Sequence, residues 1–395
     1  MEWKEVRLGD VCTRVCSGGT PKSTNLSYYG GEIPWLNTKE IDFNRIYSTE
    51  KTITDSGLNN SSAKWIVPNT VTVAMYGATA GKSCIVKVPM TTNQACCNLT
   101  INDEVADYEF VYYTLKNDYT TLASLANGGA QQNLNAQIIK DYVLKMPSLA
   151  DQRRIASILS SLDRKIELNN KINADLEEMA QAIFKNWFVD FEPFKDGKFV
   201  DSELGMIPEG WKVGTLEDIA EITMGQSPAG NSLNENGEGM IFYQGSSDFG
   251  FRFPSIRVFT TEPKRLAVAN SVLFSVRAPV GDINVAKEEC CIGRGVASIK
   301  SKYGHDSYLF YAMKSLHKLF DSFDGEGTVF GSINKKTLSA IQILLPSDGI
   351  VEQFNNVASS FDDRIRSLSD ENSRLSLLRD TLLPRLMSGE IEVPE

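Results

Sequence analysis

Residues 151–186 read DQRRIASILSSLDRKIELNNKINADLEEMAQAIFKN, and their apolar members recur every three or four positions. This spacing places them on one stripe of a helix, which at 1.5 Å per residue is about 50 Å long. Residues 350–385, IVEQFNNVASSFDDRIRSLSDENSRLSLLRDTLLPR, repeat the spacing 199 positions later without a gap. The sequence therefore predicts two equivalent long helices.

The length and register of these stripes favour pairing of the two helices with each other. The stripe extends over about four heptads, as in a coiled-coil seam. Asn173 and Asn372 place an amide in it, and a buried Asn can fix register and partner choice. The alternative is that each helix packs on its own globular half. The residues predicted to pair the helices are Ile155, Ile158, Leu162, Ile166, Asn173, Leu176, Phe354, Val357, Phe361, Ile365, Asn372 and Leu375.

The stretches that precede the helices also match each other, which indicates a duplicated domain with a period of about 200 residues. Trp3 matches Trp211, and Tyr113 matches Tyr311. The other matches are Leu8 with Leu216, Asp10 with Asp218, Gly18 with Gly225, Pro21 with Pro228, Asn69 with Asn270, Gly81 with Gly281, Asn135 with Asn334, and Pro147 with Pro346.

Each half is predicted to be a mixed α+β globule followed by one long helix. Short apolar runs between turn residues predict strands at 70–75, 83–88 and 271–276, and helical spacing predicts short helices at 107–125 and 306–319. Pro, Gly and charged residues at 192–198 predict a linker. The expected architecture is two strand-rich globular domains joined by two long antiparallel coiled-coil helices, as an internal pseudo-two-fold repeat. Its parts are domain 1 (1–147), a central helix (148–190), a linker (191–207), domain 2 (208–346), and a distal helix with a tail (347–395).

Composition excludes several classes of protein. The 395 residues contain no apolar run near the roughly 20 residues of a membrane helix and no apolar leader, so a cytoplasmic location is expected. Seven cysteines without CxxC spacing, and only two histidines, argue for reduced packing cysteines and against a zinc site or a disulfide framework. The net charge of −10 is unusual for a nucleic-acid binder. Half of the excess of acidic over basic residues lies in 347–395, so a DNA-binding face can still be locally positive.

Motifs for catalysis are not found. GATAGKS (77–83) has three residues between its glycines where a phosphate-binding loop has four, and a strand is expected after it in place of a helix. A Ser–His or Cys–His pair is disfavoured because there are only His305 and His317. Neither a GxGxxG loop after a strand nor the Asn-Pro-Pro-aromatic tetrapeptide of amino-methyltransferases is present. No catalytic or metal-binding residue is predicted.

Several stretches, in this order on a duplicated frame, resemble the specificity (S) subunit of type I restriction–modification systems. They are GGTP (18–21) with YGGEIPW (29–35), MYGATAGK (75–82), QRRIASIL (152–159) with LDRKI (162–166), WFVDFEP (187–193) with LGMIPEGW (204–211), and LPRLMSGEI (383–391). The second half departs from the first, with GEGTVFGSI (325–333) in place of GGAQQNL (128–134) and GRG (293–295) in place of TNQ (92–94). Such differences are expected if the two domains read different half-sites.

The resemblance implies a DNA-binding subunit with no catalytic activity of its own. Each target recognition domain would read one half of a bipartite site on double-stranded DNA, and the paired helices would fix the gap between the halves. Two methyltransferase (M) subunits, which bind S-adenosylmethionine, and restriction/motor (R) subunits, which use ATP and Mg, would complete the complex. No cofactor and no membrane contact is implied for this chain.

Candidate DNA contacts are polar residues in loops, because amides and guanidinium groups match base edges while cations and hydroxyls match phosphates. Two other classes remain open: a stand-alone methyltransferase or nuclease, and a coiled-coil scaffold without a nucleic-acid role. The predicted DNA contacts are Lys22, Ser23, Asn25, Tyr28, Lys82, Gln131, Gln132 and Asn133 in the first half, and Gln226, Ser227, Gln244, Arg252, Arg277, Arg294, Lys335 and Lys336 in the second.

Overall fold

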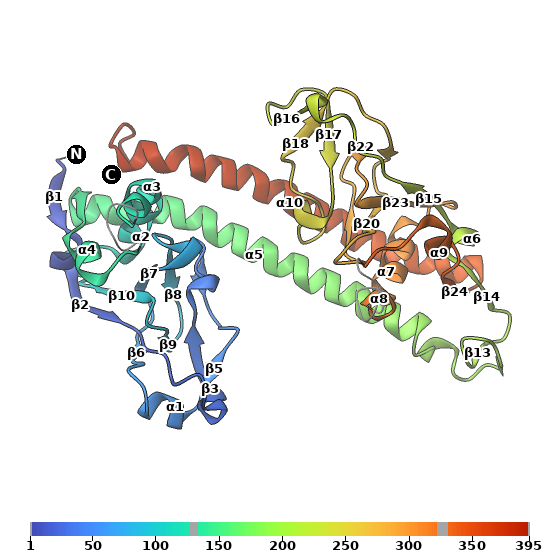
Figure 1. The fold of residues 1–395 in the computed structure, drawn as a ribbon, viewed down its shortest axis with the longest axis horizontal. Helices are drawn as coiled ribbons and strands as arrows, with labels where there is room; N and C mark the ends of the chain where they lie inside the picture. Colours follow the sequence, from blue (N-terminus) through green and yellow to red (C-terminus); the bar gives the residue numbers. More distant parts are fainter. Residues whose placement is uncertain (1, 127–132, 322–330, 394–395) are drawn as a thin grey trace. The chain divides into compact units, whose positions relative to one another are not determined.

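The computed structural model describes residues 2–126, 133–321 and 331–393 (Figure 1). The chain forms two compact units. Unit 1 contains Met1–Leu168 and Glu371–Glu395, and unit 2 contains Asn169–Asp370. The two long helices, α5 (Leu149–Phe188) and α10 (Asp348–Met387), have 40 residues each and contribute to both units. The predicted helix at 151–186 is therefore confirmed, but neither helix forms a compact unit of its own.

The strands described for unit 1 form three sheets, with both parallel and antiparallel pairs. β4 runs parallel to β8, and β3 runs parallel to β9. The first sheet has the order β2 (Cys12–Ser17), β10 (Cys96–Ile101), β7 (Val71–Ala74), β8 (Ser83–Val86) and β4 (Arg45–Ile46); the second has β5 (Thr52–Ile53), β3 (Tyr29–Leu36), β9 (Met90–Thr92) and β6 (Trp65–Ile66); and β1 (Lys4–Arg7) pairs with β11 (Val143–Met146).

Unit 2 repeats this arrangement with small differences in strand number. Here β17 runs parallel to β22, as β3 does to β9 in unit 1. The first sheet has the order β15 (Ala220–Met224), β23 (Val296–Ser301), β20 (Val272–Ser275) and β21 (Ile283–Val285); the second has β16 (Leu233–Asn234), β18 (Val258–Thr260), β17 (Met240–Tyr243), β22 (Cys290–Ile292) and β19 (Leu266–Ala267); and β14 (Lys212–Thr215) pairs with β24 (Gln342–Leu345).

The predicted strands are confirmed as β7, β8 and β20, and β8 follows the glycine-rich turn where a phosphate-binding loop requires a helix. The predicted short helices are each two helices, because the chain turns at Asp118 and at Leu316. In the linker, β12 (Phe199–Val200) pairs with β13 (Ile207–Pro208). The remaining helices are α1 (Asp55–Asn59), α2 (Tyr108–Asn117), α3 (Tyr119–Ser124), α4 (Ala136–Asp141), α6 (Leu216–Ile219), α7 (Asp306–Ser315), α8 (His317–Asp321) and α9 (Lys335–Ser339).

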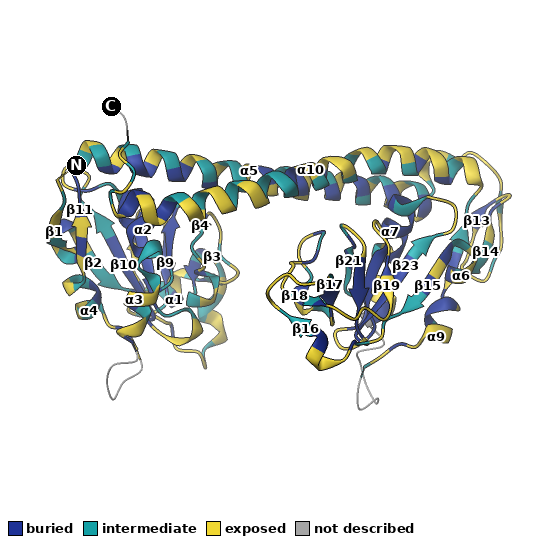
Figure 2. Cartoon of the chain, turned by 90° about the horizontal axis from the view of Figure 1, so that it is seen from above, coloured by how far each residue is buried: buried dark blue, intermediate teal, exposed yellow. Residues whose placement is uncertain are grey.

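One core in each unit combines the first sheet, a helix that covers it, and segments of both long helices. In unit 1, Ile155 of α5 and Leu386 of α10 share a core with Phe110 of α2. In unit 2, Phe184 of α5 and Phe354 of α10 share a core with Tyr308 of α7. Smaller cores lie under the second sheets. The outward faces of the long helices are exposed, and the strands are mainly buried (Figure 2).

Within each unit α5 and α10 contact each other directly. In unit 1, Arg379 of α10 donates a hydrogen bond to Asp163 of α5 at 2.7 Å, and Lys165 lies 3.4 Å from Glu371. In unit 2, the ring centroids of Phe184 and Phe354 are 5.4 Å apart. Both helices also contribute residues to the cores of both units. Each helix therefore packs on the globular part of each unit and not on one half alone, and within each unit it also contacts the other helix.

Burial along the helices supports most of the predicted stripe and corrects one position. Ile155, Phe354, Ile365 and Asn173 are buried, whereas Val357 is 40% exposed. The prediction for Val357 is wrong because Ala358, one residue further along the helix, occupies the inward position at 1% exposure. The half-buried members of the stripe are Ile158, Leu162, Ile166, Leu176, Phe361, Asn372 and Leu375.

Candidate nucleic-acid interface

Alternating strand directions bring several loops together at one end of the first sheet in each unit. In unit 1, β2 and β7 finish where β10 begins, and the Met75 amide donates to the Ala95 carbonyl at 2.8 Å. In unit 2, the equivalent Val276 amide donates to Gly295 at 3.0 Å. Residues that are far apart in the sequence therefore meet at this end, which we call the loop end of each unit.

Three of the predicted DNA contacts in unit 2 form a hydrogen-bonded group at its loop end. The Ser227 hydroxyl donates to Gln244 Oε1 at 3.1 Å, and the Arg294 amide donates to the Ser227 hydroxyl at 3.2 Å. Gln226 follows Gly225 next to this group and is exposed, as are the side chains of Gln244 and Arg294. The loop end of unit 2 thus carries two exposed glutamines and an exposed arginine on neighbouring stretches of backbone.

The equivalent group in unit 1 consists of residues that the sequence did not single out as contacts. The Thr20 hydroxyl donates to Gln94 Oε1, and Asn93 Nδ2 donates to Asn37 Oδ1 at 3.3 Å. The match between the two halves of the sequence points to these residues. Since Gly18 matches Gly225, Thr20 matches Ser227, and the stretch TNQ (92–94) stands opposite GRG (293–295).

Close backbone contact at each loop end requires glycine at two equivalent positions. A Cβ on Gly18 would lie 2.2 Å from the Asn93 carbonyl oxygen, and a Cβ on Gly225 would lie 2.1 Å from the Gly293 carbonyl oxygen. Neither distance is possible for non-bonded atoms. The absence of a side chain at Gly18 and Gly225 therefore permits the turns after β2 and β15 to lie against the loops that carry Gln94 and Arg294.

Further predicted contacts adjoin these groups through backbone hydrogen bonds. The Leu134 amide donates to Met75 at 3.0 Å, which places the exposed Asn133 beside the end of β7. In unit 2 the Ile333 amide donates to Val276 at 3.0 Å. This bond places the exposed Arg277 near the start of α9, whose first residues are the exposed Lys335 and Lys336.

The remaining predicted contacts of unit 1 have more varied surroundings. Lys22 and Ser23 are exposed, while Asn25 accepts a hydrogen bond from the Ser27 amide at 3.2 Å and so caps a turn. Tyr28 is half-buried, and Lys82 forms an ion pair with Asp42 at 2.5 Å that a phosphate would have to replace. Gln131 and Gln132 lie outside the described residues.

Arg252 is not available to DNA, which corrects its assignment as a contact. Its side chain is 2% exposed, and its guanidinium group pairs with Asp362 at 2.5 Å and with Glu177 at 3.0 Å. A buried guanidinium held by two carboxylates cannot reach a base edge or a phosphate without breaking both ion pairs. We therefore remove Arg252 from the candidate interface.

The two loop ends have the chemistry of base-edge recognition but differ in charge. In unit 1 the group consists mainly of amides and a hydroxyl, which can pair with adenine and with polar backbone atoms. In unit 2 Arg294 can form a bidentate contact with guanine, and Lys335 and Lys336 can neutralise phosphates. The two surfaces therefore suit different sequences.

Buried thiols behind the sheets play no part in this chemistry. Five of the seven cysteines are buried, as expected of packing residues, while Cys12 and Cys16 are half-buried. Burial raises the pKa of the Cys97 and Cys290 thiols to about 12, so both remain protonated at neutral pH. Among the described residues no group of three His, Cys, Asp or Glu side chains is placed to hold a metal ion, and none of the described helices is long and apolar enough to cross a membrane.

The chain is similar to known proteins in sequence and in fold. The sequence profile of the type I restriction modification DNA specificity domain matches residues 1–178 and 208–375. Two similar proteins from Methanocaldococcus jannaschii are the MjaX type I restriction enzyme specificity subunit, 34% identical over 72% of this chain and 67% of that protein, and the MjaIX specificity subunit, 27% identical over 100% and 94%. The crystal structure of a type I restriction-modification S subunit from M. genitalium, 18% identical, covers 98% of this chain and 96% of that chain with a TM-score of 0.61, which shows the fold alone.

Proposed function

Because the chain belongs to the family of the type I restriction modification DNA specificity domain, we propose that it reads a bipartite DNA sequence, one half-site for each unit. The observation that carries this proposal is the pair of loop ends. Equivalent turns present Thr20 and Gln94 in unit 1 but Ser227 and Arg294 in unit 2. A repeated scaffold with different polar side chains in equivalent turns is suited to reading two different short sequences.

The long helices are proposed to set the gap between the half-sites. Their starts lie 199 positions apart, both have 40 residues, and each unit contains direct contacts between them. We propose that α5 and α10 form an antiparallel coiled coil and that the units are related by an approximate two-fold axis. Such an axis suits two roughly inverted half-sites on DNA.

Catalysis is proposed to reside in partner subunits. Two M subunits with S-adenosylmethionine would methylate the DNA, and R subunits with ATP and Mg would cleave it, so that this chain binds no cofactor and catalyses no step. The exposed outer faces of α5 and α10 are available as binding surfaces for these partners (Figure 2). The proposed location is the cytoplasm.

The test is DNA selection from a randomised library by this chain co-produced with its methyltransferase partner, at a stated salt concentration. We expect a two-part motif with a gap of fixed length. Inserting one heptad into both α5 and α10 lengthens each helix by about 10 Å, which should extend the gap by about three base pairs. A single uninterrupted motif, or binding without any motif, would contradict the proposal and favour a scaffold role.

A further inference from the structure

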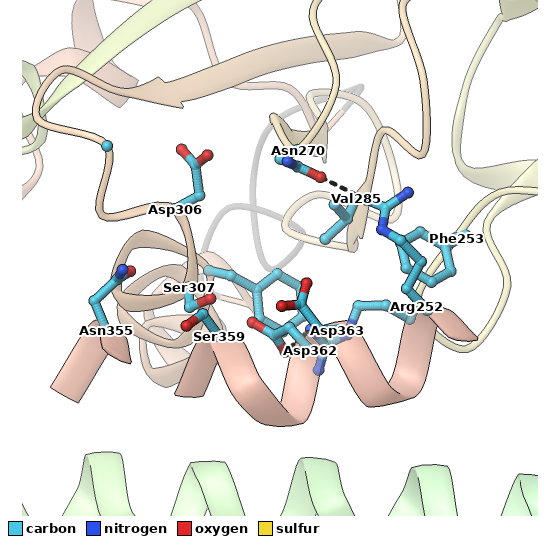
Figure 3. A pocket seen from close by; sticks show the side chains of 13 residues that line it. Arg252, Phe253, Asn270, Val285, Asp306, Ser307, Asn355, Ser359, Asp362 and Asp363 are labelled. Carbon is cyan, nitrogen blue, oxygen red and sulfur yellow. Dashed lines mark hydrogen bonds and ion pairs between the residues drawn. The ribbon is translucent and has the colours of Figure 1, made fainter. Parts of the chain in front are cut away.

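The buried Arg252 belongs to a junction that connects a loop of unit 2 to both long helices. Its Nη1 donates to Asp362 of α10 at 2.5 Å, and its Nη2 donates to Glu177 of α5 at 3.0 Å and to the Tyr311 hydroxyl at 2.8 Å. The Tyr311 hydroxyl in turn donates a hydrogen bond to Asp362 at 3.1 Å. Figure 3 shows Arg252 reaching from its loop toward Asp362 on the helix.

Unit 1 contains a junction of the same kind around Arg45. Its Nη1 donates to Glu167 of α5 at 2.9 Å, and its Nη2 lies 3.3 Å from the Tyr113 hydroxyl. That hydroxyl donates to Asp163 of α5 at 2.6 Å. Asp163 also accepts a hydrogen bond from Arg379 of α10 at 2.7 Å, so both helices take part here as well.

The two junctions occupy equivalent positions in the repeat. Tyr113 matches Tyr311, and Asp362 lies 199 positions after Asp163, in the gap-free register of the helices. Arg45 and Arg252 both come from segments that lie beside equivalent strands of the first sheet. Arg45 is on β4, which pairs with β8, and the Val285 amide of β21 donates to the Arg252 carbonyl at 2.9 Å. The repeat therefore preserves the arginine–tyrosine–aspartate arrangement, while the side chains at the loop ends differ.

A buried ion pair adds little to net stability, because removing two charges from water offsets most of their attraction. What it supplies is a defined geometry, since each guanidinium N–H must meet a particular oxygen. Both arginines are almost fully buried at their side chains, 2% exposed, and three or more polar partners fix each of them. The junctions thus restrict the angle between each globular domain and its own helix segments.

We propose that Arg45 and Arg252 are positioning residues, which hold each loop end at a fixed angle to its helix segments and so determine how strictly one gap length is preferred. Tyr113 and Tyr311 support them by bridging to the aspartates. The inference rests on the proposed function. It extends that function from the length of the helices to the junctions that connect each globular domain to its helix segments.

The experiment measures gap discrimination by the full chain bound to its methyltransferase partner. The two half-sites selected by the wild-type protein are separated by every gap within three base pairs of the optimum, and enrichment is counted for each gap. The variants are Arg45→Met, Arg252→Met, Tyr113→Phe and Tyr311→Phe. The matched control is Arg257→Met, since Arg257 follows in the same segment as Arg252 but is 61% exposed and pairs with Asp248.

In the arginine variants we expect the preference for the best gap over its neighbours to fall at least tenfold, with unchanged base preferences inside each half-site. The tyrosine variants should show a smaller fall in the same direction, and Arg257→Met should keep the wild-type profile. Circular dichroism identifies any arginine variant that fails to fold, in which case the tyrosine variants decide. An equal loss of binding at every gap, or an unchanged gap profile in folded variants, overturns the inference while the proposed function stands. A wild-type protein that selects no gapped motif overturns both.

Discussion

Replacing Phe354 by alanine should destabilise unit 2 far more than replacing its near neighbour Val357. Phe354 is 0% exposed, and its ring contacts Phe184, Trp187 and Phe188 of α5 at centroid distances of 5.3–6.2 Å. Truncating a buried Phe to Ala costs about 3–5 kcal/mol, because apolar contacts are lost and a cavity remains. Val357 is 40% exposed, so its truncation should cost about 0.5 kcal/mol or less.

Hydrogen–deuterium exchange resolved by peptide is the appropriate assay, because two units need not unfold in one step. For Phe354→Ala, amides of α7 and of residues 180–188 should exchange about a thousandfold faster, the factor that corresponds to roughly 4 kcal/mol. Amides of α2 in unit 1 should keep their wild-type rates. Equal effects of the two substitutions, or amide exchange that is less than about tenfold faster in Phe354→Ala, would refute the assignment of Phe354 to the core that α5, α10 and α7 share.

Stability should fall as pH rises above 10, because burial and then Asp163 raise the pKa of Tyr113 above that of the unfolded chain. The contribution of Tyr113 to the free energy of unfolding is complete below pH 10 and falls by about 1.4 kcal/mol per pH unit above it. Urea titrations at several pH values should therefore show a shallower decline of that free energy with pH for Tyr113→Phe than for the wild type. Gly225→Ala should lower the melting temperature of unit 2, whereas Gly230→Ala, whose Cβ meets no atom within 4 Å, should not. Lys335→Ala should weaken DNA binding about equally on all sequences and reduce the salt slope by about 1, whereas Arg294→Ala should relax the base preference at one position by about 1–3 kcal/mol. Anisotropy titrations at several salt concentrations distinguish the two.

Local periodicity was sufficient to predict the long helices and several strands, because those signals depend on neighbouring residues. The helices span 149–188 and 348–387, against the predicted core of 151–186 and its repeat. Val357 was misplaced because residues at 354, 357 and 361 fit a coiled-coil spacing, while the domain core selects Phe354 and Ala358. A helix that contacts a globular domain and another helix has more than one apolar stripe, and a single-stripe analysis cannot separate them.

The loop ends were predicted only in part, because their assembly depends on strand pairing between distant residues. Gln226, Ser227, Gln244 and Arg294 were selected for their side-chain type, and the structure brings them together. Thr20 and Gln94 are 74 residues apart and meet only through the pairing of β2 with β10. Arg252 and Arg294 are both arginines in polar loop segments, so the sequence alone does not distinguish them. The structure does, because the guanidinium group of Arg252 is buried.

The division of the chain into units has a consequence for the order in which they can fold during synthesis. Unit 2 is one continuous segment, Asn169–Asp370, whereas unit 1 needs both Met1–Leu168 and Glu371–Glu395. Leu383, Leu386 and Met387, which complete the core of unit 1, leave the ribosome after every residue of unit 2. The nascent chain therefore carries the first half of unit 1 with an unfinished core while unit 2 is made, and chaperones have the longest access to the part that was synthesised first.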